Sequence, residues 1–294
     1  MGIPKKTEFG ELFAHSHYLE CLSDERLCNP DYYKINHDTW YLYRYGDGVK
    51  VVYLKYGKEA PKRKYEQNAR SLSQKEENTR LSQSVSRTKS TIFELAICNE
   101  FEHFCTFTQD ENIVGDRFDL AKFRKDFAQF IRNENRGRED KIKYLVVPEQ
   151  HKNGAWHFHG LLSGLNDHDL RKFTLSEKLP MRIKKPIMNG ENVYNWDKYA
   201  KKFGFFTATD IKSHVACSKY ITKYITKEVV KNNLSKGQHS YFASQGLKRR
   251  ELILRTDEEP CPITNWGFEN DYIKTVWFDS AEEYTKSVFS DFEK

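Results

Sequence analysis

Residues 143–164, KYLVVPEQHKNGAWHFHGLLSG, have the pattern of two β-strands joined by a tight turn. The apolar runs at 143–149 and 156–164 have the length and composition of strands. Between them, Asn153-Gly154 is the strongest short signal for a hairpin turn. This stretch therefore predicts an antiparallel hairpin at the centre of the fold.

His157 and His159 are the chemically most informative residues of this hairpin. Side chains two residues apart leave a strand on the same face, so the two imidazoles lie side by side. Antiparallel pairing across the turn brings Glu149 back towards this pair. Two imidazoles and a carboxylate suit Mn²⁺, Mg²⁺ or Zn²⁺, with positions left open for water or a phosphate oxygen.

Simpler explanations exist for each of these residues. The chain has ten histidines in 294 residues, so one HxH pair by chance is unremarkable. Glu149 can also be an exposed carboxylate at a strand end. His151, in the turn, is a competing ligand that we rank below Glu149.

The second informative stretch is SKYITKYITKEVVK at 218–231. On a helix, residues four apart stack above one another, so three stripes are expected. The apolar stripe that would face the core is Cys217, Ile221, Ile225 and Val229; the second is Tyr220 and Tyr224; the third is Lys219, Lys223, Lys227 and Lys231. Phenols beside ammonium groups, on a face not needed for packing, suggest a surface that engages phosphate. The alternative is ordinary tyrosine packing beside a solvated lysine face.

The remaining elements predict an α+β fold with an antiparallel sheet. We expect helices at 90–99 and 119–135, strands at 103–108 and 203–211, and a final helix that Asp210 or Ser213 caps and that extends to about Asn232. Residues 61–90 contain almost no large aliphatics and are expected to form a linker or a solvated helix. We divide the chain into an N-terminal region with a basic linker (1–89), a central domain (90–250) and an acidic C-terminal segment (251–294).

The charge distribution indicates a polyanionic partner. The net charge is +6, but residues 201–250 alone carry eleven Lys and Arg against two acidic residues. Residues 251–294 reverse this ratio, with eleven acidic residues against four basic ones. A basic working surface beside an acidic segment is typical of nucleic-acid partners, although charged runs are also common on solvated faces.

Several other classes are disfavoured. No apolar stretch approaches the length of a membrane span, and the N-terminus has no secretory h-region or myristoylation pattern. None of the six cysteines forms a CxxC pair, which favours a reduced, cytosolic protein. A structural zinc among His15, His17, Cys21, Cys28 and His37 is a minor alternative, because the spacing matches no common zinc pattern. The chain has no GxxxxGK[ST] and no GxGxxG, which disfavours an ATPase or a dinucleotide enzyme.

Together these motifs resemble the HUH endonucleases, the family of rolling-circle replication initiators and their relatives. FCTFTQD at 104–110 resembles the first family motif, and PEQHKNGAWHFHGLL at 148–162 resembles the second. YITKYITK at 220–227 resembles the third in its two-tyrosine form, which is found in initiators of isometric single-stranded DNA phages and in related plasmid and transposon proteins. The resemblance covers roughly residues 90–250.

The resemblance implies an RRM-like palm, an antiparallel sheet of about five strands with helices on one face and the metal site on the other. It implies that Glu149, His157 and His159 bind Mg²⁺ or Mn²⁺, and that Tyr220 or Tyr224 attacks DNA to give a 5′-phosphotyrosine link. Lys223 and Lys227 would position the phosphate. We also expect Lys219, Lys231, Thr106 and Thr108 to contact the DNA.

The implied partners are single-stranded DNA at a replication origin, a host helicase and a host DNA polymerase, in the cytoplasm of a bacterial host and with no membrane involved. Two rival hypotheses remain. One is an HUH transposase or relaxase with the same chemistry. The other is a metal-free nucleic-acid-binding module, for which Phe107 and Phe158 would supply base-stacking rings.

Overall fold

The structure, a computed structural model, describes residues 38–55, 74–226, 240–259, 263, 265–270 and 273–289. By their contacts these residues separate into two units, one within residues 70–249 and one formed from residues 1–69 and 250–294. Each unit has its own antiparallel sheet and its own hydrophobic core.

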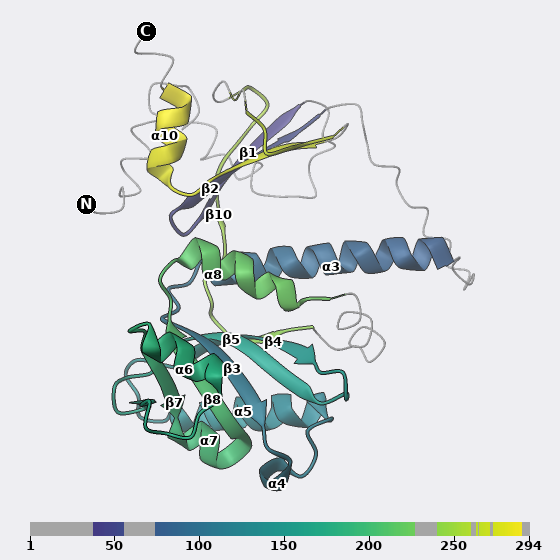
Figure 1. Ribbon diagram of the computed structural model, residues 1–294. Coiled ribbons are helices and arrows are strands. Elements are labelled where there is room, and N and C mark those ends of the chain that lie inside the picture. Colours follow the sequence, from purple (N-terminus) through teal and green to yellow (C-terminus); the bar gives the residue numbers. More distant parts are fainter. Residues whose placement is uncertain are drawn as a thin grey trace. The chain divides into compact units, whose positions relative to one another are not determined.

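The unit within residues 70–249 has a seven-stranded sheet in the order β6-β7-β8-β3-β5-β4-β9 (Figure 1). Its strands are β3 (His103–Gln109), β4 (Lys143–Gln150), β5 (Trp156–Ser163), β6 (Leu170–Lys172), β7 (Val193–Trp196), β8 (Gly204–Asp210) and β9 (Phe242–Ala243). Its helices are α3 (Gln74–Ile97), α4 (Glu111–Val114), α5 (Leu120–Glu134), α6 (Met181–Met188), α7 (Asp197–Phe203) and α8 (His214–Ile221). The predicted α+β class with an antiparallel sheet is confirmed.

Helices α5 and α7 cover one face of this sheet. Helix α5 begins after Asp119, whose side chain accepts a hydrogen bond from a backbone N–H of the first helical turn. Its buried Phe123 and Phe127 lie four residues apart and pack against Phe107 of β3 and Phe158 of β5. Burial of a phenylalanine side chain of this kind contributes about 1.5–3 kcal/mol.

Helices α3 and α8 pack against each other over the opposite face (Figure 1). Ile92 and Leu95 of α3 and Ile221 of α8 join Leu145 and Leu161 of the sheet in a second buried cluster. Helices therefore cover both faces, where one covered face and about five strands were expected. The reason lies in β5, which buries every residue except the last and so needs cover on both sides.

The β4–β5 hairpin has the predicted turn. The His151 N–H donates to the Ala155 carbonyl over 2.9 Å, and Gly154 adopts a φ of 87°, which costs a glycine little. Further along β5, a Cβ at Gly160 would lie 2.9 Å from both the Phe107 ring and a Val146 methyl group. The small residue lets the neighbouring side chains close over this strand.

The second unit has a five-stranded sheet in the order β10-β1-β2-β12-β11. Its elements are β1 (Thr39–Tyr45), β2 (Gly48–Leu54), β10 (Glu251–Thr256), β11 (Phe268–Glu269), β12 (Ile273–Phe278) and α10 (Ala281–Phe289). Strand β1 pairs with β2 on one side and with β10 on the other. The sequence predicts separate regions at 1–89 and 251–294, whereas strands from both share this sheet.

Two sequence expectations concern residues at the margins of the described chain. Residues 74–90 belong to α3, so the described part of the expected linker or solvated helix is helical. The minor zinc alternative at residues 15–37 lies outside the described residues. In the part of the chain that the structure describes, no helix is long and apolar enough to cross a membrane.

Candidate catalytic site

The two histidines of the hairpin lie at the centre of the seven-stranded sheet. In the register of β5 with β3, His157 is opposite Thr108 and His159 is opposite Thr106. On the other side, Glu149 of β4 is opposite His157. Both histidines are buried, with 7% and 8% of their surface exposed. The strand register thus brings the predicted ligands onto one face beside the two threonines.

Each imidazole has a hydroxyl group at its Nδ1. Thr108 Oγ1 lies 3.2 Å from His157 Nδ1, and Thr106 Oγ1 lies 3.5 Å from His159 Nδ1. On the other edge of its ring, His159 Nε2 lies 2.9 Å from Glu149 Oε2. The contacts at Nδ1 orient both rings so that Nε2 is the nitrogen directed away from β3.

The donor set fits a hard divalent ion with mixed nitrogen and oxygen ligands. Two ligands about 2.1 Å from an octahedral ion and at right angles to each other are about 3 Å apart, close to the separation of His159 Nε2 and Glu149 Oε2. The rings of His157 and His159 are 4.9 Å apart, and the ring of His151 lies 5.0 Å from that of His157. In the described part of the chain, no three His, Cys, Asp or Glu side chains converge on one point as they would around a bound ion.

Burial keeps both imidazoles neutral. Burial, together with the smaller effects of His159, His151 and Arg182, lowers the pKa of His157 to about 3. Burial also lowers the pKa of His159, although the hydrogen bond and the negative charge of Glu149 oppose this shift. A neutral imidazole offers a lone pair, which is the form that binds metal ions.

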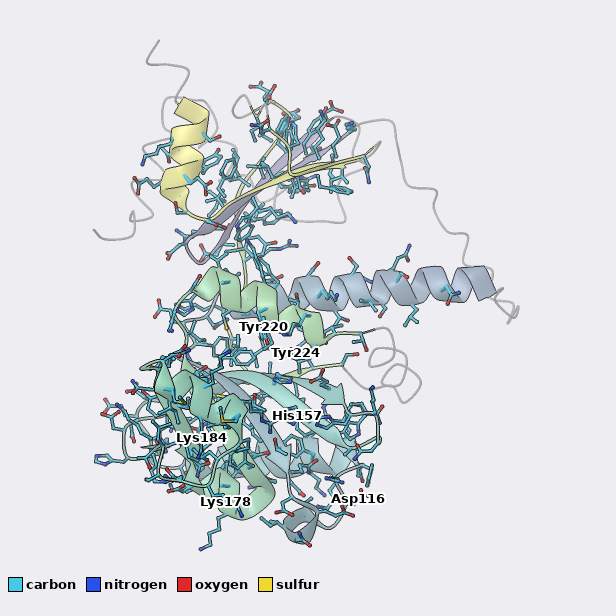
Figure 2. All side chains as sticks on the ribbon, viewed as in Figure 1. Asp116, His157, Lys178, Lys184, Tyr220 and Tyr224 are labelled. Atoms are coloured by element: carbon cyan, nitrogen blue, oxygen red, sulfur yellow. The ribbon has the colours of Figure 1, made fainter. Side chains whose placement is uncertain are left out.

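The tyrosine segment lies over this face of the sheet (Figure 2). Ser213, one of the two predicted caps, accepts a hydrogen bond from the Ala216 N–H at the start of α8. Tyr220 lies on α8, and Tyr224 ends the 3₁₀ turn Thr222–Tyr224 that follows. The α-helix therefore ends at Ile221 and not at about residue 232; residues 227–239 are outside the described chain.

Tyr224 is in direct contact with the histidines. Its ring stacks on the imidazole of His159, with centroids 3.7 Å apart and an angle of 15° between the planes. It is buried within the cluster that contains Ile221 and Ile225, with 8% of its surface exposed. The expectation that both tyrosines lie on a face not needed for the core is therefore wrong for Tyr224.

Tyr220 differs from Tyr224 in exposure and in acidity. Its exposed fraction is 46%, and its hydroxyl accepts a hydrogen bond from the Tyr224 hydroxyl over 3.0 Å. The Lys223 ammonium lies 3.4 Å from the centroid of the Tyr220 ring. Hydrogen bonding to Lys223 and to Tyr224 lowers the pKa of Tyr220, whereas burial raises that of Tyr224.

The other predicted residues have mixed positions. Lys219, predicted to contact DNA, is exposed on α8, whereas Lys227 and Lys231 lie outside the described residues. Thr106 and Thr108, also expected to contact DNA, face the imidazoles. Phe107 and Phe158, the rings expected to stack on bases in the rival hypothesis, are fully buried on the α5 side of the sheet.

Two contributors to the site were not foreseen. Phe104 of β3 lies 6.0 Å from the His159 ring and 5.4 Å from the Tyr220 ring, between centroids. The positive charge of Arg182, on α6, contributes to the low pKa of His157. The alternation of β3 gives Phe104 the same face as Thr106. No comparable local signal connects Arg182 to the hairpin.

Comparison with known protein families gives a match over the part of the chain that contains these residues. Residues 102–229 match the model of the family described as Replication-associated protein ORF2/G2P. The matched range includes β3, the β4–β5 hairpin and both tyrosines, and it supports a rolling-circle replication initiator family. No curated protein and no solved structure matches the chain.

Proposed function

We propose that this protein initiates rolling-circle replication by nicking and rejoining single-stranded DNA at an origin. The observation that carries this proposal is the stacking of Tyr224 on His159, with the Tyr220 hydroxyl one hydrogen bond away. Candidate nucleophiles and candidate metal ligands, which are 61 or more residues apart in sequence, therefore meet at one place. The match to replication-associated proteins over the same residues supports this function.

Tyr220 is proposed as the nucleophile of the first cut. Its Oη forms a bond to phosphorus, and the bond from phosphorus to the 3′ oxygen breaks. The tyrosine then carries the 5′-phosphate, its proton passes to water, and the leaving oxygen takes up a proton to become a free 3′-OH. Rejoining is the reverse reaction, in which a 3′-OH attacks the phosphotyrosine.

Three features of the chain favour Tyr220 for this step. It is the more exposed tyrosine, the ammonium group of Lys223 lies beside its ring, and the Tyr224 hydroxyl donates to its oxygen. A positive charge and a hydrogen-bond donor both stabilise a phenolate and so favour attack near neutral pH. Tyr224 would cut the regenerated origin after one round, once it leaves its stacked position.

Glu149, His157 and His159 are proposed to hold Mg²⁺ or Mn²⁺, which would act as a Lewis acid on the scissile phosphate. The threonines at Nδ1 would keep Nε2 of each histidine available to the ion. The free 3′-OH would prime a host polymerase, and a host helicase would unwind the duplex, in the cytoplasm of a bacterial cell.

The rival hypotheses make different predictions. A relaxase or transposase would share the cleavage chemistry and differ in the DNA it joins. A non-catalytic module would need base-stacking rings on the sheet, and the two that the sequence suggested, Phe107 and Phe158, are each 0% exposed. This burial favours the catalytic proposal over the module.

The test is a nicking assay on labelled single-stranded oligonucleotides from the element that encodes the protein, with Mg²⁺, Mn²⁺ or EDTA. We expect a covalent protein–DNA adduct and a 3′-OH product that a polymerase can extend, both dependent on the metal ion. A chain that binds these oligonucleotides but forms no adduct under any of these conditions would be a binding module. A joined product from two different DNA molecules would favour a transposase or relaxase.

A further inference from the structure

The five-stranded sheet of the second unit has a face that carries aromatic rings and basic side chains. Trp40 and Leu42 of β1 point into the core of this unit, so the alternate residues Tyr41, Tyr43 and Tyr45 point to the opposite side. We call this side the tyrosine face; it consists of Tyr41, Tyr43, Tyr45, Lys50, Trp277, Arg250 and Arg255.

The rings of this face are arranged by the sheet register. Tyr41 and Tyr43 lie parallel, with an angle of 5° between their planes and 6.0 Å between their centroids. Trp277 of β12 meets Tyr45 edge-on at 5.3 Å. The Trp277 ring occupies the space above Gly48, where a Cβ would come within 2.5 Å of the ring. The aromatic surface thus depends on a glycine at this position.

Arginine side chains lie on the tyrosine rings. The guanidinium of Arg250 lies 4.3 Å from the centroid of the Tyr43 ring and donates to the Tyr45 hydroxyl over 2.8 Å. The guanidinium of Arg255 lies 5.4 Å from the centroid of Tyr41. Planar guanidinium groups on phenol rings are surfaces on which nucleobases stack.

The charge of this face is positive. Lys50 lies opposite Tyr43 in the register, and burial, with the charge of Arg250, lowers its pKa. In the described strands, the positions that share the face by register include neither Asp nor Glu; one residue past β12, the Asp279 carboxylate accepts a hydrogen bond from Trp277 Nε1 over 2.7 Å. On the other side of the same sheet, Lys274 pairs with Glu269 at 2.9 Å and Arg44 pairs with Glu251 at 2.5 Å.

We propose that the tyrosine face is a second binding surface for single-stranded DNA, built on a different unit of the chain from the catalytic site. Bases would stack on the Tyr41, Tyr43 and Arg250 planes, while Lys50 and Arg255 would meet the phosphates. The family match ends at residue 229 and does not include this unit. The choice of DNA over RNA rests on the proposed function, but binding at this face needs no cleavage.

Binding is tested with the full-length protein in EDTA, by fluorescence anisotropy of labelled oligo(dT), oligo(rU) and a duplex of the same length. A stacked base contributes about 1–3 kcal/mol, so Tyr43→Leu is expected to weaken oligo(dT) binding by roughly 5- to 100-fold. Tyr43→Phe keeps the ring and is expected to bind as the wild type does. Equal affinity of wild type and Tyr43→Leu overturns the proposal.

A second pair of variants tests the phosphate contacts of the tyrosine face without changing its aromatic rings. Lys50→Gln and Lys274→Gln each remove one positive charge, on opposite faces of the same sheet. Lys50→Gln should weaken oligo(dT) binding and lower the slope of log K against log salt by about 0.7, as expected for one phosphate contact. Lys274→Gln should leave the slope unchanged. Equal effects of the two substitutions, or no effect of either, overturn the proposal even if Tyr43→Leu fails to fold.

The remaining outcomes identify other partners. If Tyr43→Leu weakens binding of the duplex as much as binding of oligo(dT), base stacking is overturned, because paired bases do not expose their faces. Oligo(rU) binding that is tighter and more sensitive to Tyr43→Leu would overturn the assignment to DNA. Nicking by a protein whose DNA affinity is unaffected by these variants would disprove this inference and leave the proposed function intact. DNA binding that depends on the tyrosine face, in a protein that does not nick DNA, would support this inference and disprove the proposed function.

Discussion

The ring of Tyr224 lies 3.7 Å from the ring of His159 and is almost parallel to it. One of the two candidate nucleophiles therefore covers a candidate metal ligand. Tyr220, one turn earlier, stays 46% exposed and accepts the hydrogen bond of the Tyr224 hydroxyl. The two tyrosines are four residues apart and have different environments, so their roles should be separable by experiment.

The first prediction concerns the order in which the tyrosines react. In a single-turnover reaction on one origin strand, Tyr220→Phe should reduce adduct formation more than Tyr224→Phe, because Tyr220 is the exposed residue beside Lys223. Each single variant should retain some activity, and the double variant should form no adduct. Peptide mapping of the DNA-linked residue is the measurement.

Replacement of tyrosine by phenylalanine keeps the ring, so the stacking on His159 provides the control for folding. Thermal unfolding should change little in Tyr224→Phe. An adduct in the double variant, or one mapped outside residues 218–228, would contradict the two-tyrosine mechanism. A larger loss for Tyr224→Phe than for Tyr220→Phe would reverse the assigned order.

The second prediction concerns the metal ligands. His157→Ala, His159→Ala and Glu149→Gln should each abolish nicking, since each removes a donor from a site with few ligands. DNA affinity in EDTA should stay within about threefold of the wild type, because none of these side chains carries a positive charge near neutral pH. Mn²⁺ binding, followed by electron paramagnetic resonance, should weaken in all three variants.

His151→Ala is the matched control. His151 belongs to the turn, and its ring lies 5.0 Å from that of His157. A smaller loss of Mn²⁺ affinity in His151→Ala than in Glu149→Gln is expected. If His151→Ala has the larger effect, the third ligand is His151. Unchanged metal dependence in a His157→Ala/His159→Ala double variant would disprove the site.

Local sequence signals predicted the hairpin correctly. The Asn153-Gly154 turn and the period of two in β5 depend on neighbouring residues only, so they can be read without the fold. The pairing of Glu149 with His157 follows from the length of that turn. Because the turn length sets the strand register within this one hairpin, the candidate ligands could be named from the sequence.

The tyrosine segment shows the limit of that approach. A continuous α-helix places residues 220 and 224 on the same face, but α8 ends at Ile221 and continues as a 3₁₀ turn with about three residues per turn. The tighter winding changes the direction of Tyr224 and brings it into the core. The packing of this segment against α3 and the sheet depends on residues far apart in the sequence, so helical periodicity cannot predict it.

The sheet of the second unit was beyond sequence analysis for a similar reason. Strands β1 and β10 are about 200 residues apart, and their pairing includes a bulge between Leu42 and Tyr43. Neither strand carries a signal that identifies its partner. The contact of Thr106 and Thr108 with the histidines depends likewise on the β3–β5 register, which spans about 50 residues.

The third prediction concerns these threonines. Thr108→Val removes the hydroxyl at His157 Nδ1 and keeps the shape of the side chain, so it should weaken Mn²⁺ binding by about 10- to 100-fold. Thr108→Ser restores a hydroxyl and should recover most of that affinity. The affinity for single-stranded DNA in EDTA should be the same in both variants. Isothermal titration with Mn²⁺ gives the comparison.

Thr209→Val is the matched control, because Thr209 lies on β8 opposite Phe104, two strands away from the histidines of β5. It should leave Mn²⁺ affinity unchanged. Equal weakening by Thr108→Val and Thr209→Val would mean that the hydroxyl does not position the ring. Weak DNA binding in Thr108→Val alone would instead favour the sequence-based expectation that this residue contacts DNA.

The fourth prediction concerns stability in acid without metal ions. His157 has a pKa of about 3 in the folded chain, against 6.5 for an ordinary histidine, so the unfolded chain binds its proton more tightly. The stability that follows from this difference is complete above pH 6.5 and is lost as the pH falls from 6.5 towards 3. Each pH unit in that window costs up to about 1.4 kcal/mol for one such group.

Urea unfolding in EDTA at pH 7.5, 6.5, 5.5 and 4.5 measures this dependence. His157→Asn removes the titrating group, so its free energy of unfolding should fall less steeply between pH 6.5 and 4.5 than that of the wild type. The exposed His168→Asn should follow the wild-type curve. Because burial also lowers the pKa of His159 and of His103, some dependence should persist in His157→Asn and should decrease further when His159 is replaced as well. Parallel curves for the wild type and His157→Asn would mean that the folded chain accommodates a charged imidazole at this position, which would contradict the burial of His157 between β3 and β4.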